Sequence, residues 1–248
     1  MEKLKANNIT VSYNGENTIE DINIHLNEGE IVSLLGVSGS GKTTLFNILS
    51  GLMIPDCGQV LLDGEDITCK TGKMSYMLQK DLLLPYYTVL DNVALPLVVR
   101  GEKKKVARDK ALDHFSFFGL EGTENKYPHE LSGGMRQRAA FLRTYLSCDG
   151  VALLDEPFSA LDTITKSALH QWYLDIMKEI KLSSLIVTHD IDEAILLSDR
   201  IYILSGKPGR ITDEIIVDLP KPRNNALSMS QEFLTYKRKI VEKIALGL

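Results

Sequence analysis

Short apolar runs bounded by polar turns fill the first 80 residues and return after residue 149. Residues 30–36, 150–157 and 183–190 have largely apolar centres, which is typical of parallel strands buried on both faces. Each precedes a stretch with helical spacing, so the pattern predicts an α/β fold. Further strands are predicted at residues 8–13, 22–26, 58–64, 73–79, 200–204 and 210–219, and helices at 45–52, 165–180, 192–199 and 231–246.

The pattern changes between about Asp81 and residue 148. Residues 82–101 contain two prolines and show no clean alternation of apolar and polar positions. Residues 103–120 have helical spacing, and another helix is predicted from about Gly133. This block therefore reads as a helical lobe inserted into the α/β chain. Its first helix is expected to carry Val106, Ala107, Leu112, Phe115 and Phe118 on or near one face.

Charge and cysteine content narrow the class of protein. The net charge of −5 argues against a dedicated nucleic-acid binder, which usually carries a basic excess. The three cysteines, Cys57, Cys69 and Cys148, form no CxxC pair. An odd number without such spacing fits a reducing cytosol better than a disulfide scaffold or a metal cluster.

The chain shows no sign of a membrane segment. Its first residues, MEKLKANNITVSY, lack the apolar run of a signal peptide. No stretch of about 18 uninterrupted apolar residues occurs, which is the length that a membrane-spanning helix needs. We therefore expect the protein to act at a membrane only through a partner.

A phosphate-binding loop is the clearest chemical motif. GVSGSGKT, from Gly36 to Thr43, follows a predicted buried strand and precedes a predicted helix. Its glycines let backbone N–H groups point at phosphates, Lys42 should reach the β- and γ-phosphates, and Thr43 should hold Mg²⁺. A chance glycine-rich turn is the alternative. The predicted nucleotide contacts are Gly36, Ser38, Gly39, Ser40, Gly41, Lys42, Thr43 and Thr44.

An acidic pair follows the predicted strand at 151–154. Asp155 stands at the carboxyl end of that strand, which is where ligands bind in parallel α/β sheets. Asp155 can hold Mg²⁺, and Glu156 can orient or deprotonate an attacking water. The alternative is an acidic cap on the following turn. Beside a phosphate loop, the functional interpretation is favoured.

LSGGMRQR, from Leu131 to Arg138, has the composition of a second anion-binding loop. A small hydroxyl residue, two adjacent glycines and two arginines open a predicted helix. A helix N-terminus with accessible N–H groups attracts anions. Since the chain already has a complete phosphate loop, the composition alone does not say what this second loop binds.

Together these motifs resemble the nucleotide-binding subunit of an ATP-binding cassette (ABC) transporter. The phosphate loop, the glutamine of SYMLQK, LSGG, LLDEP, SALD and the histidine of IVTHD occur in the family's order. The resemblance implies one ABC ATPase domain with a RecA-like P-loop NTPase core, an N-terminal antiparallel β subdomain and an inserted helical subdomain. It implies a core at 1–80 and 149–220, a helical subdomain at 81–148, and a linker with a C-terminal helix at 221–248.

The resemblance also offers a role for the second loop. In such cassettes two copies associate head to tail, and LSGG of one copy closes over ATP held by the other. Ser132, Gly133 and Gly134 would then contact a partner's γ-phosphate, and Asp162 of SALD would contact the partner's phosphate loop and help align Glu156. Ser132 can also be an ordinary helix N-cap, and the two roles are compatible.

Three further residues take their roles from the resemblance. Gln79 would reach Mg²⁺ or the attacking water, His189 would hydrogen-bond the γ-phosphate or the water, and Tyr13 would stack on adenine. The alternatives are an exposed glutamine at a strand end, a histidine that is merely a satisfied polar residue, and a tyrosine that is simply part of an N-terminal strand. Met135, where Gln is common after LSGG, and Val37, where many relatives differ, remove no phosphate-contacting group.

Three stretches resemble the importer group for nitrate, alkanesulfonates, taurine and thiamine-pyrimidine precursors. They are KDLLLPYYTVLDNVALPL, LSGGMRQRAAFLRT and GRITDEIIVDLPKPR. Leu83, Leu84, Tyr86 and Tyr87 in the first are expected to be exposed and to form a groove for a helix of a membrane permease, with local packing as the alternative. The resemblance implies a peripheral protein on the cytoplasmic face of the membrane. Its partners would be the permease, a second cassette and, indirectly, a substrate-binding protein.

Two other functions remain open. A soluble ABC ATPase for repair or translation is disfavoured because the chain has no long inserted coiled coil, no second cassette and no basic patch. A scaffold without catalysis is disfavoured by the presence of Lys42, Asp155, Glu156 and His189 together. The transported solute cannot be read from this chain.

Overall fold

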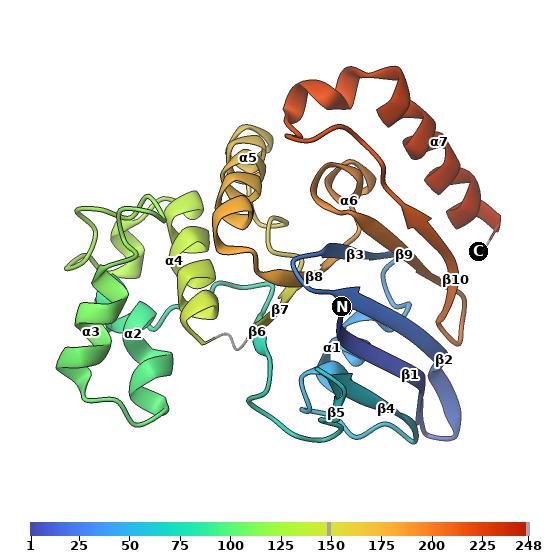
Figure 1. Cartoon of the computed structure of the whole chain (residues 1–248), viewed down its shortest axis with the longest axis horizontal. Coiled ribbons are helices and arrows are strands. Elements are labelled where there is room, and N and C mark those ends of the chain that lie inside the picture. Colours follow the sequence, from blue (N-terminus) through green and yellow to red (C-terminus); the bar gives the residue numbers. More distant parts are fainter. Residues whose placement is uncertain (148–149, 247–248) are drawn as a thin grey trace.

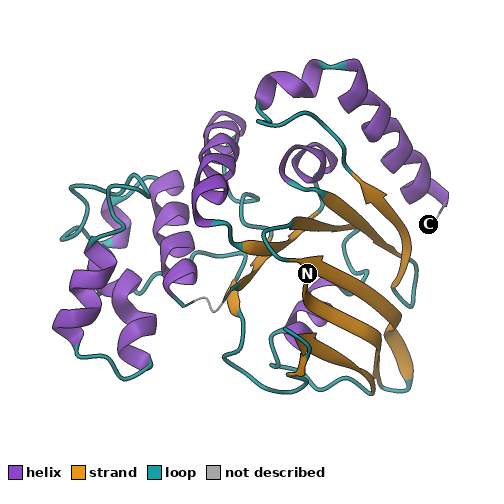
Figure 2. Cartoon of the chain, viewed as in Figure 1, coloured by secondary structure: helices purple, strands orange, loops and turns teal. Residues whose placement is uncertain are grey.

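The computed structural model describes residues 1–147 and 150–246. It contains two β-sheets, with helices packed around the larger one and a separate group of helices beyond its edge (Figures 1 and 2). The helices are α1 (Lys42–Leu49), α2 (Val89–Val99), α3 (Lys104–Leu112), α4 (Gly133–Leu146), α5 (Thr163–Ile180), α6 (Ile191–Leu197) and α7 (Gln231–Leu246), with short 3₁₀ helices at Pro128–Glu130 and Asn225–Met229.

The larger sheet confirms the predicted α/β core. Its strand order is β10-β9-β3-β8-β7-β6, and all neighbours are parallel except β10 and β9. Its central strands are buried along their whole length, as their apolar sequences predict. The strands are β3 (Ile31–Gly36), β6 (Ser75–Met77), β7 (Val151–Asp155), β8 (Ser183–Thr188), β9 (Arg200–Ser205) and β10 (Arg210–Ile216).

The register brings the carboxyl ends of the central strands to one edge. Leu35 of β3 pairs with Thr188 of β8, and Asp155 of β7 pairs with Val187. Met77 of β6 pairs with Leu154. The segments that follow these four strands therefore meet at the same edge, where ligands bind in parallel α/β sheets.

The smaller sheet is antiparallel, which confirms the expected N-terminal β subdomain. Its order is β2-β1-β4-β5, with β1 (Glu2–Tyr13), β2 (Glu16–Asn27), β4 (Cys57–Leu62) and β5 (Glu65–Asp66). β1 and β2 are longer than predicted, and β5 was not predicted. The inner face of this sheet shares one apolar core with α1, to which Leu45 and Phe46 contribute fully buried side chains.

The helical block contains one helix that the sequence pattern missed. α2 begins at the N-cap Thr88, whose hydroxyl accepts a hydrogen bond from the backbone N–H of Asp91 at 3.2 Å. Pro96 lies inside the helix, and its position hid the helical pattern because proline usually ends a helix. Figure 1 shows α2 and α3 on the far side of α4 from the larger sheet.

The expected apolar face of the next helix was partly wrong. Ala107, Phe115 and Phe118 are buried, but Val106 and Leu112 are exposed. α3 ends at Leu112 and buries only two alanines four residues apart, so its buried face is narrow. The two phenylalanines follow the helix and enter the core from the next turns.

Several predictions concern residues at the limits of the described chain. The predicted boundary between the helical block and the core, at residues 148 and 149, lies outside the described residues, as do Cys148 and residues 247–248.

Cys57 and Cys69 are exposed and free. Among the residues described, no helix is both long and apolar enough to cross a membrane.

Candidate nucleotide-binding site

The loop between β3 and α1 has a backbone that requires its glycines. Gly39 and Gly41 have φ angles of +82° and +94°, a region that residues with a Cβ rarely adopt. A Cβ on Gly41 would also overlap the Ile19 side chain, and one on Gly36 would overlap the carbonyl oxygen of Leu204. The loop therefore wraps tightly and enters α1 at Gly41, with the N-terminal N–H groups of the helix free for an anion.

The loop forms one wall of a cleft of about 630 Å³ at the carboxyl edge of the larger sheet. The cleft brings together segments from five parts of the chain that are distant in sequence. Most of the predicted site residues line it, together with Thr18, which was not predicted. The lining residues are Thr18, Ser38, Gly39, Gly41, Lys42, Thr43, Thr44, Gln79, Asp155, Glu156 and His189.

Two predicted residues support the loop instead of lining the cleft. Gly36 is the last residue of β3, where its missing side chain leaves room for the backbone of Leu204. The Ser40 hydroxyl donates to the carbonyl oxygen of Val37 at 2.9 Å, which closes the loop on itself.

Lys42 is buried at the floor of the cleft. Its Nζ donates to the carbonyl oxygens of Gly36 and Val37, both at 2.8 Å, so the ammonium is held against the loop. Burial lowers the pKa of Lys42, and the negative charges of Glu156 and Asp155 oppose that shift. A phosphate in the cleft would offer the ammonium stronger, charge-assisted hydrogen bonds than the two carbonyls.

Asp155 adds a buried carboxylate to the cleft that Thr43 also lines. Burial and the neighbouring charge of Glu156 raise the pKa of Asp155, whereas a hydrogen bond from Tyr76 and the charge of Lys42 lower it in part. The Tyr76 hydroxyl lies 3.4 Å from Oδ2 of Asp155. Burial and the Asp155 charge raise the pKa of Tyr76, which therefore remains a neutral donor.

The oxygen donors of the cleft fit Mg²⁺. Thr43 offers a hydroxyl, Asp155 a carboxylate and Gln79 an amide oxygen, and all three line the same cleft. Mg²⁺ in nucleotide sites usually binds one or two such groups and takes its remaining ligands from phosphates and water. Accordingly, within residues 1–147 and 150–246 no group of three or more His, Cys, Asp or Glu side chains could hold a metal by itself.

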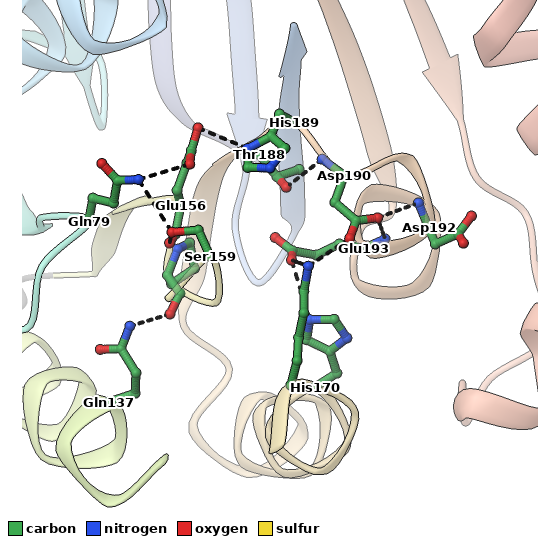
Figure 3. A network of polar contacts seen from close by, with 12 residues as sticks. Gln79, Gln137, Glu156, Ser159, His170, Thr188, His189, Asp190, Asp192 and Glu193 are labelled. Atoms are coloured by element: carbon green, nitrogen blue, oxygen red, sulfur yellow. Dashed lines mark hydrogen bonds and ion pairs between the residues drawn. The ribbon is translucent and has the colours of Figure 1, made fainter. Parts of the chain in front are cut away.

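Glu156 is held on both carboxylate oxygens (Figure 3). Gln79 donates from Nε2 to Oε2 at 3.1 Å, and His189 Nδ1 lies 3.1 Å from Oε1. The backbone of Glu156 has a φ of +44°, which is uncommon for a residue other than glycine and costs free energy. Its N–H donates to the carbonyl oxygen of Val187 at 2.9 Å, and this bond helps to hold the unusual conformation.

Tyr13 is not among the residues that line the cleft. It ends β1, is about half exposed, and its hydroxyl lies 3.1 Å from the sulfur of Met53. Its adenine-stacking role therefore stays a prediction.

The residues of the second loop do not line the cleft either. Ser132 is the N-cap of α4 and accepts a hydrogen bond from the N–H of Met135 at 3.3 Å, so the N-cap reading is confirmed. Asp162 is the N-cap of α5 and accepts from the N–H groups of Ile164 and Thr165 at 3.1 and 3.0 Å.

The two caps belong to one surface region. A Cβ on Gly133 would lie 3.2 Å from the Leu161 side chain, and a Cβ on Gly134 would lie 3.2 Å from Thr165. The start of α4 therefore packs against the start of α5. Figure 1 likewise shows α4 and α5 side by side.

Sequence reasoning missed three residues around the site. Thr18 of β2 lines the cleft, and the Ser159 hydroxyl lies 3.4 Å from Nε2 of Gln79. The buried side chain of Gln137 donates to the carbonyl oxygen of Pro157, next to Glu156. Ser159 and Gln137 lie in the motifs SALD and LSGGMRQR and could have been considered, but Thr18 lies in an ordinary strand and gives no signal.

The segment after Gln79 corrects one prediction and agrees with another. Leu83 is buried, not exposed, so it cannot line an open groove. Leu84 and Tyr87 are partly exposed, and Tyr86 is 90% exposed. The cause is the fully buried Asn92, which binds the backbone of Leu84 through both of its amide atoms and turns Leu83 inward.

Comparisons with known proteins agree with this geometry. The family model described as ABC transporter matches residues 19–159, more than half of the chain. The formylaminopyrimidine import ATP-binding protein ThiZ of Halalkalibacterium halodurans is 43% identical over 96% of this chain and 95% of its own length. The aliphatic sulfonates import ATP-binding protein SsuB of Bacillus cereus is 41% identical over 92% of this chain and 89% of its own.

Solved structures give the same result. The ATP-binding cassette MJ0796, in a dimeric post-hydrolysis state bound to ADP and Pi, has a TM-score of 0.74 and 31% identity over 88% of this chain and 100% of its own. CbiO1 of Clostridium perfringens has a TM-score of 0.79 at 24% identity and supports the fold alone. A phosphate loop, an acidic pair and a glutamine–glutamate–histidine set at one sheet edge thus occur in a chain with close cassette relatives. The chain belongs to the ABC transporter family and is an ATPase of that family.

Proposed function

We propose that this chain is the ATP-hydrolysing subunit of an importer, in which closure of two cassettes over ATP drives uptake of a small solute through a separate permease. The relatives ThiZ and SsuB are import ATP-binding proteins, which supports the direction of transport. The main structural support for hydrolysis is that Gln79 contacts one carboxylate oxygen of Glu156 and His189 the other, in the phosphate-binding cleft.

The cleft residues divide the work of hydrolysis. Lys42 and the loop N–H groups bind the β- and γ-phosphates, exchanging the two carbonyl contacts of Lys42 for phosphate oxygens. Thr43, Asp155 and Gln79 would hold Mg²⁺, which when bound neutralises charge on the phosphates. Tyr13 would stack on adenine.

Glu156 is the proposed general base. It takes a proton from water as the water oxygen bonds to the γ-phosphorus and the bond to the β–γ bridging oxygen breaks, which yields ADP and inorganic phosphate. One oxygen of Glu156 must exchange its present partner for the water. The residue released in this way, His189 or Gln79, can then hydrogen-bond the γ-phosphate or the water, while the other still holds Glu156.

The second loop would act on a partner's ATP. Ser132, Gly133, Gly134 and Asp162 share one surface region and do not line their own cleft, so they are available to another chain. The positive end of α4 and the Ser132 hydroxyl suit a γ-phosphate. The relative MJ0796 has been solved as a dimer bound to ADP and Pi, which supports a two-chain site.

The permease would dock beside Gln79, on the cytoplasmic face of the membrane. Leu84, Tyr86 and Tyr87 expose apolar and aromatic surface there, and Leu82 adds to it. Because Gln79 touches Glu156 and stands three residues before Leu82, a permease helix at this surface could influence the catalytic site. A substrate-binding protein would act through the permease, and no nucleic-acid partner is proposed.

The test combines hydrolysis with crosslinking in the assembled transporter. Wild-type protein should hydrolyse Mg·ATP, and Glu156→Gln should do so only slowly, because the amide cannot accept the proton. Tyr87→Cys should crosslink to cysteines in the cytoplasmic loops of a copurified permease. Val241→Cys, on α7 and of similar exposure, is the matched control and should not crosslink.

The outcomes separate the alternatives. A soluble ATPase unconnected to transport would hydrolyse ATP but copurify with no permease. An inactive scaffold would show no difference between wild type and Glu156→Gln. Crosslinks at position 241 but not at 87 would place the docking surface elsewhere.

A further inference from the structure

Between α5 and the start of α6, just after His189 in the chain, lies a cluster of four charged or titratable side chains. The proposed hydrolysis does not use them. Lys166 and His170 come from α5, and Asp190 and Glu193 from the start of α6 (Figure 3 labels the last three). Nζ of Lys166 lies 2.6 Å from Oδ2 of Asp190 and 3.1 Å from Oε2 of Glu193. Nε2 of His170 lies 3.4 Å from the same oxygen of Glu193.

Three of the four side chains are largely withdrawn from water, and the fourth, Asp190, is 36% exposed. The Glu193 side chain is 3% exposed, that of His170 9% and that of Lys166 20%. Opposite charges in such surroundings interact more strongly than exposed pairs, and removing one partner leaves a buried charge without compensation. Burial by itself would lower the pKa of Lys166, but its contacts with Asp190 and Glu193 outweigh that effect and raise the pKa. Lys166 is thus a charged bridge between α5 and α6.

Asp190 fixes the backbone directly after His189. Its N–H donates to the Thr188 hydroxyl at 3.0 Å, and its Oδ1 accepts from the N–H groups of Asp192 and Glu193 at 3.0 and 3.1 Å. Asp190 therefore uses one carboxylate oxygen to cap α6 and the other to bind Lys166. With strand β8 before His189 and this cap after it, the position of the imidazole beside Glu156 depends on where Asp190 is held.

The other end of the bridge is tied to the second loop's surface region. The backbone N–H of Lys166 donates to the carbonyl oxygen of Asp162 at 2.8 Å, in the first turn of α5. Lys166 therefore stands one helical turn from Asp162 and one side-chain contact from the residue that follows His189.

We propose that Lys166 is a positioning residue that couples the start of α5 to His189 through Asp190. The inference rests on the proposed function, since it assigns His189 to hydrolysis and Asp162 to the dimer surface. A partner chain that moves or stiffens the Asp162 turn would act on His189 through this bridge. Glu193 holds the Lys166 ammonium as its second partner, and His170 lies beside Glu193.

The first test is a kinetic comparison of Lys166→Met with wild type in the purified cassette. Methionine keeps the unbranched apolar stem and removes the ammonium. Outer partners of metal ligands typically contribute about 10- to 100-fold to affinity or activity, and by analogy we expect kcat to fall about tenfold with KM for ATP within about twofold. Lys166→Arg should restore most of kcat, because it keeps the charge and the donors.

A matched control lies on the same helix. Lys178 forms an exposed ion pair with Asp175 at 2.9 Å, far along α5 from the site. Lys178→Met makes the same chemical change on the same helix, and kcat should remain that of wild type. A fall in kcat equal to that of Lys166→Met would show a general effect of charge on α5 and overturn the proposal.

A double-mutant cycle tests the route through His189. If Lys166 acts by positioning His189, then Lys166→Met should lower kcat little further in a His189→Ala background. If the two residues act independently, their fold-decreases in kcat should multiply in the double variant, and such a result would refute the coupling. A purely structural role would lower the melting temperature but leave this non-additivity absent.

Asp190→Asn keeps the test decisive if Lys166→Met folds poorly. Asparagine caps helices as well as aspartate does, so the variant should retain the start of α6 while losing the charge that faces Lys166. It should lower kcat about as much as Lys166→Met does. Full activity of Asp190→Asn would overturn the proposal, whereas absence of ATPase in the wild-type protein would count against the proposed function itself.

Discussion

The phosphate loop and the second loop have related compositions, but the chain surrounds them differently. The first lies between β3 and α1, backed by Ile19 and Leu204, with a buried lysine and two carboxylates in the same cleft. The second opens α4, where the Ser132 hydroxyl accepts a hydrogen bond from the N–H of Met135, at a surface shared with the start of α5. The first loop thus has the other walls of a nucleotide site in its own chain, whereas the residues of the second loop do not line that cleft.

The difference shows what decides whether a glycine-rich helix N-terminus forms a nucleotide site within its own chain. A helix N-terminus attracts anions in both cases, but selectivity and catalysis come from the groups that face it. The first loop faces Asp155, Glu156 and His189 across the cleft. In the proposed dimer, the second loop meets the corresponding groups of another chain. Four predictions test this contrast, in order of decreasing effect.

Lys42→Ala should have the largest effect. A charge pair at about 4 Å and an effective dielectric near 20 is worth roughly 4 kcal/mol before desolvation, equivalent to about a thousandfold in affinity. ATP binding should fall by a large part of this factor and hydrolysis should stop. Equilibrium binding and phosphate release in the purified protein measure both. Unchanged turnover would show that the first loop is not the site.

Glu156→Gln and Ser132→Arg should separate binding from closure. Glu156→Gln should bind ATP, hydrolyse it slowly and elute as a dimer in size-exclusion chromatography with ATP. Adding Ser132→Arg should abolish that dimer, because a bulky cation would block the approach to the partner. Each monomer should still bind ATP, since its own loop is intact. The trans assignment fails if the double variant dimerises as well as the single one, or if Ser132→Arg alone removes ATP binding.

A matched pair of glycine substitutions compares the loops directly. Gly41→Ala forces a side chain onto a φ of +94° and into Ile19, and it should weaken ATP binding to the monomer at least about tenfold, since left-handed strain alone costs roughly 1–2 kcal/mol. Gly134→Ala lies in a helix, and its Cβ would lie 3.2 Å from the Thr165 side chain, a much smaller overlap than that of a Gly41 Cβ with Ile19 at 2.3 Å. It should leave monomer binding within about twofold and lower turnover. If both variants lose monomer ATP binding equally, the two loops do not differ in their contribution to the cleft of their own chain.

Ser132→Ala should have the smallest effect. Loss of the N-cap hydrogen bond to Met135 should cost about 1 kcal/mol of the free energy of unfolding, or a shift of about 2–4 °C in melting temperature. Ser132→Thr, which keeps the hydroxyl, should lose much less. ATP binding by the monomer should not change in either variant. A loss of monomer ATP binding in Ser132→Ala would indicate that Ser132 acts in the cleft of its own chain.

Much of the fold follows from the sequence because the buried strands carry their own signal. β3, β7 and β8 are apolar and buried along their length, and their carboxyl ends locate the site. α2 could not be predicted in this way because Pro96 interrupts the helical pattern. Leu83 was wrongly expected at the surface because its burial depends on Asn92, a polar residue whose fully buried position no local pattern reveals.

The candidate site shows the same limit. The resemblance to ABC cassettes predicted that Gln79, Glu156 and His189 would act around the same phosphate and water, and their contacts agree with that arrangement. The positive φ of Glu156 and the Lys166 bridge depend on how separate elements pack, so spacing does not predict them. Thr18 belongs to β2, a strand of the other sheet, and still lines the cleft. Gly41 packs against Ile19, the residue after Thr18, and the sequence gives no sign of this contact.

The support beneath the phosphate loop also sets the order in which the site can be assembled during synthesis. Gly209, in the connection between β9 and β10, lies against the Ser40 carbonyl so closely that no Cβ would fit, and it exchanges backbone hydrogen bonds with Thr18 and Glu20. Synthesis completes the loop's sequence at residue 44, but Gly209 is added to the chain some 165 residues later. We therefore expect nascent chains that end before β10 to lack high-affinity ATP binding, so that nucleotide binding reports a nearly finished polypeptide.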